Sequence, residues 1–184
     1  MKLVMLDRDG VLTVERANYV KHPGELLLIP RAAEACAALN AAEVKVAVVS
    51  NQSIVGRGII SAEMLERIHA KLRVELAAAG ARLDLLLTCL DPPWAAGERR
   101  KPAPGMLREA LAHFRLSPVE AVMVGDQLSD LRAARAAAVA PILVRTGKGA
   151  ETQALGLPQD ILPVSVYDDL HGAVEALLAS RPQR

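Results

Sequence analysis

The chain has little of what defines several common classes of protein. Its two cysteines, Cys36 and Cys89, are far apart in 184 residues, which argues against a disulfide scaffold and suits a reducing compartment. Aromatic residues make up 2% of the chain and its net charge is +1, so it offers no basic, aromatic surface to nucleic acid or to an anionic membrane. No apolar run approaches the length of a membrane span, and we expect a cytoplasmic protein.

Hydrophobic residues, in contrast, make up 52% of the chain, and strand-like and helix-like patterns alternate along it. Such alternation is typical of a parallel sheet covered by helices. We therefore predict an α/β fold with a doubly wound, mainly parallel, Rossmann-like sheet and helices on both faces. A chain of this length is expected to form one hydrophobic core. We assign residues 1–180 to a single domain and 181–184 to a C-terminal tail.

Short apolar runs predict six strands, and three-to-four spacing of apolar residues predicts five helices. The strands are expected at 1–6, 44–49, 83–87, 121–124, 141–144 and 161–166. The helices are expected at 31–42, at 128–138, from an N-cap at Ser61 through Leu76, from Pro104 through Phe114, and from a cap at Asp168 to about Ala179. The intervals between them leave no room for an inserted lid domain, so we expect an open site.

Two aspartates, Asp7 and Asp9, follow the first predicted strand directly. Open α/β sheets bind their ligands at the carboxyl ends of their strands. Burying two carboxylates costs free energy unless a cation or a chemical task offsets that cost. Alone, the pair could belong to an ordinary turn; at this place in the fold it indicates a metal, a phosphate reaction, or both.

Three further polar segments are expected at the same edge of the sheet: Ser50-Asn51, Lys101-Pro102, and Gly125-Asp126 with Asp130. Taken singly, they could be turn formers, a solvated lysine and a helix cap. Together, carboxylate and carbonyl oxygens suit Mg²⁺, and a hydroxyl beside an ammonium suits a phosphoryl group. A carboxylate can attack phosphorus, and a second one can protonate the leaving oxygen.

The order of these motifs, Asp-x-Asp-Gly-Val, Ser-Asn, Lys-Pro and Gly-Asp-x-x-x-Asp, resembles the four motifs of the haloacid dehalogenase superfamily of phosphatases. Within it, Arg-Lys-Pro from residue 100 and Val-Arg-Thr-Gly from residue 144 are similar to the branch without a cap domain, the histidinol-phosphate and heptose-bisphosphate phosphatases. The likeness covers nearly the whole chain. It implies a Mg²⁺-dependent phosphate monoester hydrolase that works through an aspartyl-phosphate.

The resemblance also implies a role for each matching residue. Asp7 would be the nucleophile and a Mg²⁺ ligand, and Asp9 would be the general acid and base, with its backbone carbonyl on the metal. Ser50 and Lys101 would hold the phosphoryl group, and Asp126 would complete the metal site. Contacts to the substrate are implied for Asn51, Gln52, Ser53, Arg57, Arg100 and Gln127.

Two positions depart from the pattern. Gln127 stands where close relatives often carry lysine, which puts its role in doubt. The stretch 89–100 keeps one of the four ligands of a structural zinc loop, too few for a tetrahedral site. We therefore predict Mg²⁺ and no zinc, and expect prolines and the indole of Trp94 to hold this loop. Asp130 is expected to orient other groups rather than to bind the metal.

The resemblance implies a small phosphorylated sugar or amino-alcohol as substrate, and we expect a monomer without nucleic-acid or membrane partners. Heptose 1,7-bisphosphate, losing the phosphate at its seventh carbon, is the leading substrate. Histidinol phosphate and a broad range of sugar phosphates remain open. So do a 3′-phosphatase for nucleic-acid ends, which the near-neutral charge disfavours, and a silent binding protein, which the intact motifs disfavour.

Two other features have plainer interpretations. The glycine-rich segment 145–149 fails as a phosphate-binding loop because Gly149 stands where Ser or Thr should be, so we expect a turn there. The resemblance puts the loop containing His22 near the substrate, and a surface role is equally open.

Overall fold

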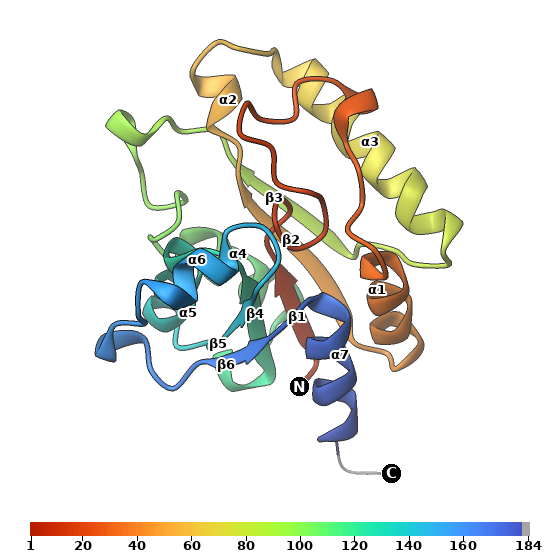
Figure 1. Ribbon diagram of the computed structural model, residues 1–184, viewed down its shortest axis with the longest axis vertical. Coiled ribbons are helices and arrows are strands. Elements are labelled where there is room, and N and C mark those ends of the chain that lie inside the picture. Colours follow the sequence, from red (N-terminus) through yellow and green to blue (C-terminus); the bar gives the residue numbers. More distant parts are fainter. Residues whose placement is uncertain (182–184) are drawn as a thin grey trace.

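The computed structural model describes residues 1–181, and its centre is a six-stranded sheet in the order β3-β2-β1-β4-β5-β6 (Figure 1). All five neighbouring pairs are parallel. The predicted α/β fold is therefore confirmed. The strands are β1 (Leu3–Leu6), β2 (Lys45–Asn51), β3 (Leu85–Cys89), β4 (Ala121–Gly125), β5 (Ala140–Val144) and β6 (Ser165–Tyr167).

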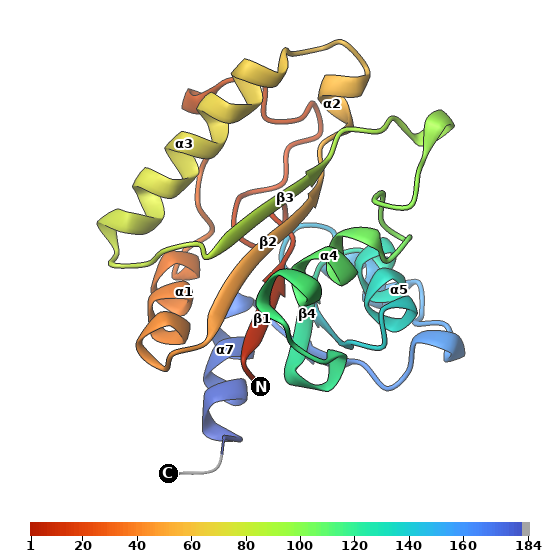
Figure 2. The same cartoon turned by 180° about the vertical axis from the view of Figure 1, so that it is seen from behind.

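Helices cover both faces of the sheet because the residues of β1 point alternately to the two sides. Val4 and Leu6 belong to a core shared with one group of helices, and Leu3 and Met5 to a core shared with another. Figures 1 and 2 show the two groups on opposite sides of the sheet. The first group is α1 (Ala32–Ala41), α3 (Ala62–Ala78) and α7 (Leu170–Ala179); the second is α4 (Gly105–Phe114) and α5 (Leu128–Ala136).

Six shorter helical elements were not predicted, because segments of three to six residues are too short to show a helical period. Two are α-helical, α2 (Ser53–Gly56) and α6 (Gly149–Ala154). Four are 3₁₀ turns: η1 (Pro23–Glu25), η2 (Pro93–Ala95), η3 (Pro118–Glu120) and η4 (Gln159–Ile161).

Most predicted boundaries lie within two residues of the observed ones, but the start of the last strand and the cap of the last helix are wrong. The last strand begins at Ser165 rather than at 161, because η4 occupies the start of the predicted run. Asp169, not Asp168, caps the last helix: its Oδ1 accepts a hydrogen bond of 2.8 Å from Gly172 N. Asp168 pairs with Arg145 instead. The predicted cap at Ser61 is confirmed, since its Oγ accepts from Met64 N at 3.2 Å.

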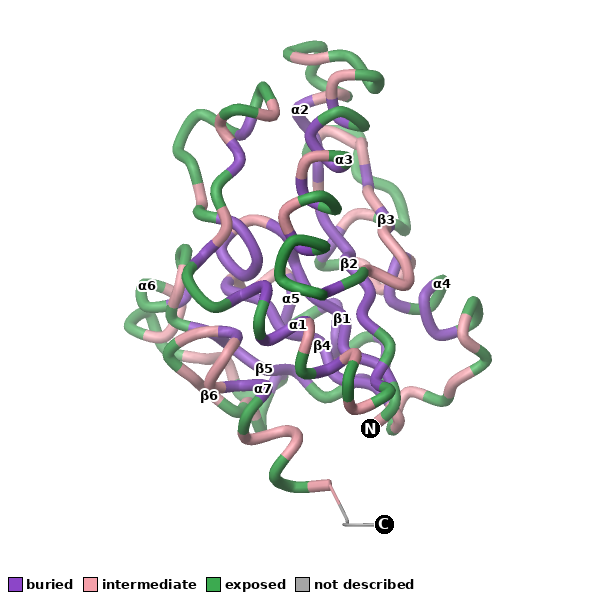
Figure 3. Tube along the Cα trace, turned by 90° about the vertical axis from the view of Figure 1, so that its right-hand side faces the viewer, coloured by how far each residue is buried: buried purple, intermediate pink, exposed green. Residues whose placement is uncertain are grey.

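The strand order reverses between β1 and β4, and polar loops gather where these strands end. Figure 3 shows buried strands inside and exposed loops around them. Within residues 1–181, the chain between β1 and β2 holds only η1 and α1, so no inserted domain covers this edge. No helix of the described part has both the length and the apolarity to cross a membrane. The single domain over 1–180 stays a prediction, and tail residues 182–184 lie outside the described part.

Candidate active site

A cavity of about 330 Å³ opens where β1, β2 and β4 end. This volume is in the range of small-molecule sites. Most of the residues predicted from the sequence contribute to its wall: Asp7, Asp9, Ser50, Asn51, Ser53, Arg57, Arg100, Lys101 and Gln127. The other two, Gln52 and Asp126, are buried and contact residues of the wall. The structure therefore brings together every segment that the sequence selected.

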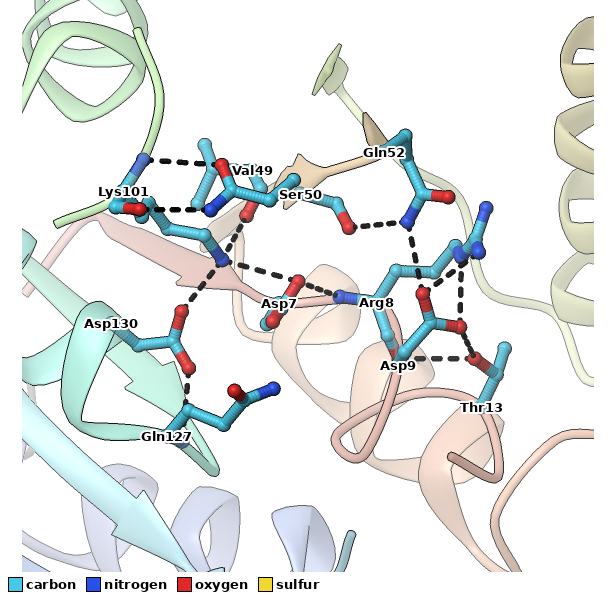
Figure 4. Close-up of polar contacts among 11 residues, drawn as sticks. Asp7, Arg8, Asp9, Thr13, Val49, Ser50, Gln52, Lys101, Gln127 and Asp130 are labelled. Carbon is cyan, nitrogen blue, oxygen red and sulfur yellow. Dashed lines mark hydrogen bonds and ion pairs between the residues drawn. The ribbon is translucent and has the colours of Figure 1, made fainter. Parts of the chain in front are cut away.

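Asp7 follows β1 and is almost fully buried, with 7% of its surface exposed. Its Oδ1 accepts a hydrogen bond of 2.7 Å from Arg8 N and lies 3.2 Å from Lys101 Nζ (Figure 4). Burial raises the pKa of Asp7 to about 6; Lys101 opposes this rise and the nearby carboxylates of Asp130 and Asp9 add to it. The carboxylate is thus dehydrated and fixed, which suits an attacking group.

The ammonium group of Lys101 is the buried positive charge beside this carboxylate. Its Nζ lies 2.6 Å from Asp130 Oδ1 and donates to the carbonyl of Val49 at 2.8 Å (Figure 4). Burial alone would lower the pKa of Lys101, but Asp130 and Asp7 outweigh it and the pKa is raised. Asn51 holds the lysine backbone, donating to its carbonyl at 2.9 Å and accepting from its N–H at 3.1 Å. A charged ammonium is therefore fixed next to Asp7.

Asp9 is held by three neighbouring side chains. Arg8 donates to both of its oxygens, at 3.1 and 2.8 Å, Thr13 donates at 3.0 Å, and Gln52 donates at 2.9 Å. Burial would raise the pKa of Asp9, but the Arg8 ion pair and these hydrogen bonds outweigh it, so the pKa is lowered. Gln52 also donates to Ser50 Oγ at 2.9 Å, which links Asp9 to the end of β2. In this arrangement Asp9 is an anion directed toward Arg8.

Asp126 lies at the end of β4, within reach of two other acidic groups. Three carboxylate oxygens, one each from Asp7, Asp126 and Asp130, lie within 4.8 Å of one another. Burial, followed by the charges of Asp7 and Asp130, raises the pKa of Asp126 to about 8. Its Oδ2 accepts from Lys148 N at 2.8 Å, whereas its buried Oδ1 has no hydrogen-bond partner among residues 1–181. A hard cation would satisfy this oxygen and offset the repulsion, so the oxygen donors fit Mg²⁺.

Glycines allow two loops to approach Asp126 closely. A Cβ on Gly10 or Gly147 would lie 2.1 or 2.2 Å from Asp126 Oδ2, and both residues have positive φ angles of 83° and 57°. Thr146 Oγ1 donates to the carbonyl of Gly10 at 2.6 Å and joins the two loops. Residues 145–148 form a turn, as predicted, and Gly149 begins α6; the turn also supplies the backbone N–H of Lys148, which holds Asp126.

Sequence reasoning missed several residues of the site. Arg8 and Thr13 hold Asp9, and no pattern in the sequence marks an arginine that will be 1% exposed. The cavity wall also includes Glu15, Arg16, Tyr19, Val20, Ser129 and Lys148. His22 does not line the cavity: it is exposed and accepts from Gly24 N at 3.1 Å, which caps η1.

Hydrogen bonds close the base of the 89–100 loop. Asp91 Oδ2 accepts from Gly97 N at 3.1 Å, and Arg100 Nη1 donates to the carbonyl of Asp91 at 2.8 Å. The expected anchoring by the indole is wrong, because Trp94 is 72% exposed. The absence of zinc stays a prediction.

Comparisons with known proteins agree on one family. Residues 98–173 match a family model described as HAD-hydrolase-like. The chain is 40% identical to a D-glycero-beta-D-manno-heptose-1,7-bisphosphate 7-phosphatase of Pseudomonas aeruginosa, over 96% of this chain and 97% of that protein. It is 38% identical to a protein of the same name from Pseudomonas putida, over 97% and 100% of the two chains. A crystal structure of D,D-heptose 1,7-bisphosphate phosphatase from Bordetella bronchiseptica, complexed with magnesium and phosphate, matches with a TM-score of 0.93 at 37% identity, covering 98% of this chain and 100% of that one.

Proposed function

The chain belongs to the D-glycero-D-manno-heptose-1,7-bisphosphate 7-phosphatase family of HAD-like hydrolases, and on this premise we propose that it hydrolyses the 7-phosphate ester of that sugar bisphosphate. It is an enzyme of the phosphatase class. The observation that carries the proposal is the position of Asp7 in the cavity wall, 3.2 Å from the Lys101 ammonium and within the carboxylate cluster that includes Asp126. The proposed nucleophile, the proposed phosphate-binding cation and the proposed metal ligands therefore lie side by side.

In the proposed mechanism, an oxygen of Asp7 attacks phosphorus and the bond to the sugar oxygen breaks, which leaves an aspartyl-phosphate. Lys101 and the hydroxyl of Ser50 hold the phosphoryl oxygens. Asp9 gives its proton to the leaving sugar oxygen and then takes one from the water that attacks phosphorus and regenerates Asp7. Because Arg8 holds Asp9 as an anion, Asp9 must leave that ion pair and take up a proton before it can act as an acid.

We propose that Asp7, Asp126 and the backbone carbonyl of Asp9 hold Mg²⁺. When bound, the ion neutralises charge on the phosphoryl oxygens and so lowers the barrier to attack by an anion. Asp130 joins the same cluster of oxygens, but its ion pair of 2.6 Å supports a role in positioning Lys101. We further propose that the chain holds no zinc, since the 89–100 loop keeps only one of the four N/S ligands that a structural zinc site needs, and hydrogen bonds to Asp91 close the loop.

Mg²⁺ should stabilise the protein more at high pH than at low pH. The pKa values of Asp7 and Asp126 rise from 3.8 to about 6 and about 8 in the fold. Between pH 3.8, the unperturbed pKa, and these raised pKa values, the folded protein therefore binds more protons than the unfolded chain. Its stability falls as pH rises through this window. Mg²⁺ binds the ionised carboxylates and reverses this loss. We expect the increase in Tm on adding Mg²⁺ to be larger at about pH 8 than at about pH 5.

The comparison with and without Mg²⁺ at each pH isolates this effect. Burial and Arg8 lower the pKa of His69 to about 4, which acts on stability in the opposite direction, but this contribution cancels in the difference. Asp126→Asn serves as the control and should remove most of the Mg²⁺ effect. An equal rise in Tm at both pH values would contradict this account of the cluster.

A side-by-side turnover measurement tests the substrate. With Mg²⁺ present, kcat/KM for heptose 1,7-bisphosphate should exceed that for histidinol phosphate by at least about 100-fold, the size of effect that two charged contacts to a second phosphate can supply. The product should be the heptose 1-phosphate. Equal values for the two substrates, or a faster reaction with histidinol phosphate, would sink the proposal.

We also propose that the enzyme acts as a cytoplasmic monomer without a nucleic-acid or membrane partner. The net charge of +1 supports the second part, and the two free, buried cysteines suit a reducing compartment.

A further inference from the structure

Arg57, a residue of the cavity wall, lies over two aromatic rings from different loops. The Arg57 Cζ lies 5.1 Å from the ring centroid of Trp94 and 6.0 Å from that of Tyr19. Both distances are in the range of cation–π contacts. Tyr19 lies in the loop after β1, Trp94 lies in the loop after β3, and Arg57 follows α2. One guanidinium group thus connects three segments at the cavity.

The loop that carries Trp94 is packed directly against the end of α2. A Cβ on Gly56 would lie 2.2 Å from the carbonyl oxygen of Leu90 and 2.9 Å from Pro92 Cδ, so only glycine permits this approach. The hydrogen bonds from Gly97 to Asp91 and from Arg100 to Asp91 close the same loop. These contacts hold the loop in place, and the loop positions the Trp94 indole next to Arg57, although 72% of the surface of Trp94 is exposed.

The charge of Arg57 is available to an anion. Lys148, another cation of the cavity wall, is paired with Glu15 at 3.0 Å. Within residues 1–181, no carboxylate oxygen lies within 4.0 Å of the Arg57 guanidinium group. Its Nε donates to Ser53 Oγ at 3.4 Å, and its Cζ lies over the two rings. Rings restrict the orientation of a guanidinium group and leave its N–H edge free to bind an anion.

We propose that Trp94 and Tyr19 are positioning residues that orient Arg57 toward the second, non-reacting phosphate of a sugar bisphosphate. This inference rests on the proposed function and deepens it. On this account the 89–100 loop contributes to substrate selection through Trp94. The hydrogen bonds from Gly97 and Arg100 to Asp91 hold the loop in the conformation that brings the indole to Arg57. The discrimination between a bisphosphate and a monophosphate depends in part on Trp94.

Steady-state kinetics on heptose 1,7-bisphosphate and heptose 7-phosphate test this inference. For Trp94→Ala, we expect KM for the bisphosphate to rise about fivefold, the equivalent of one lost cation–π contact, with kcat within about twofold. KM for the monophosphate, which lacks the second anion, should change by less than about twofold. Trp94→Phe keeps an aromatic face and should restore most of the bisphosphate KM. Val119→Ala, at a residue that is 88% exposed and outside the cavity wall, is the matched control and should behave like the wild type.

Fluorescence provides a second readout, because Trp94 is the only tryptophan of the chain. In an Asp7→Asn background, which prevents turnover, heptose 1,7-bisphosphate should change the emission of Trp94 and heptose 7-phosphate should not. If the wild type hydrolyses the bisphosphate while Trp94→Ala leaves both KM values unchanged and the emission does not respond, the positioning role is overturned and the proposed function stands. If the wild type does not hydrolyse the bisphosphate, the proposed function fails and the inference fails with it.

Discussion

Replacing Asp7 by asparagine is expected to lower kcat by at least about 10⁴-fold, in the range found when a covalent nucleophile is removed. An amide oxygen is a poor nucleophile and forms no stable acyl phosphate under these conditions. The substitution also takes one negative charge from the cluster with Asp126 and Asp130, so Mg²⁺ affinity should fall as well. The measurement is the initial rate of phosphate release at saturating Mg²⁺ and substrate.

The fold should survive this change, since the amide preserves the shape of the side chain. Asp7→Asn should melt at or above the wild-type temperature without Mg²⁺, because burial disfavours the ionised carboxylate it replaces. Asp168→Asn is the matched control: its side chain is 88% exposed, and neither it nor its partner Arg145 lines the cavity, so activity should stay within about twofold of wild type. If Asp7→Asn kept more than a small fraction of wild-type activity, another group would have to be the nucleophile.

Asp9→Asn should lower kcat by about 10²-fold to 10⁴-fold, the contribution typical of a general acid and base. The proposed metal ligand at this position is the backbone carbonyl, which the substitution preserves. Mg²⁺ binding, measured by the rise in Tm or by calorimetry, should therefore change little. The variant should also melt lower than the wild type, because Arg8 is 1% exposed and loses its charged partner.

Thr13→Val separates the catalytic from the structural part of this result. It removes one hydrogen bond to Asp9 and leaves the carboxylate, so it should cost far less turnover than Asp9→Asn. Activity loss in Asp9→Asn that runs in parallel with loss of Mg²⁺ binding would show that the carboxylate itself holds the metal. That outcome would contradict the roles proposed here.

The sequence predicted which residues converge at the cavity because a parallel sheet places the ends of its strands along one edge. Asp7, Ser50 and Asp126 follow or end apolar runs, so their convergence required only the strand order. Lys101 follows no strand, and its prediction depended on the likeness to a known family. Its carbonyl and N–H are fixed by Asn51, a contact between distant segments that no local pattern marks.

The remaining features depend on side-chain packing that sequence patterns do not encode. Arg8 lies between two predicted site residues, yet its burial beneath the site and its ion pair with Asp9 arise only in the folded chain. Lys148 was assigned to a simple turn, although its N–H holds Asp126. The contact of Arg57 with the Trp94 ring was missed for the same reason: the proline-rich loop suggested that the indole would anchor it, and the fold places the indole at the surface.

Detection of the covalent intermediate tests the central claim most directly. Enzyme mixed with substrate and Mg²⁺ is quenched in acid during turnover and reduced with borohydride, which converts an aspartyl-phosphate to homoserine; the digested protein is then read by mass spectrometry. The account predicts homoserine at position 7 and unmodified aspartate at positions 9, 126 and 130. Phosphate on Ser50, or homoserine at any of the other three positions in place of position 7, would contradict it.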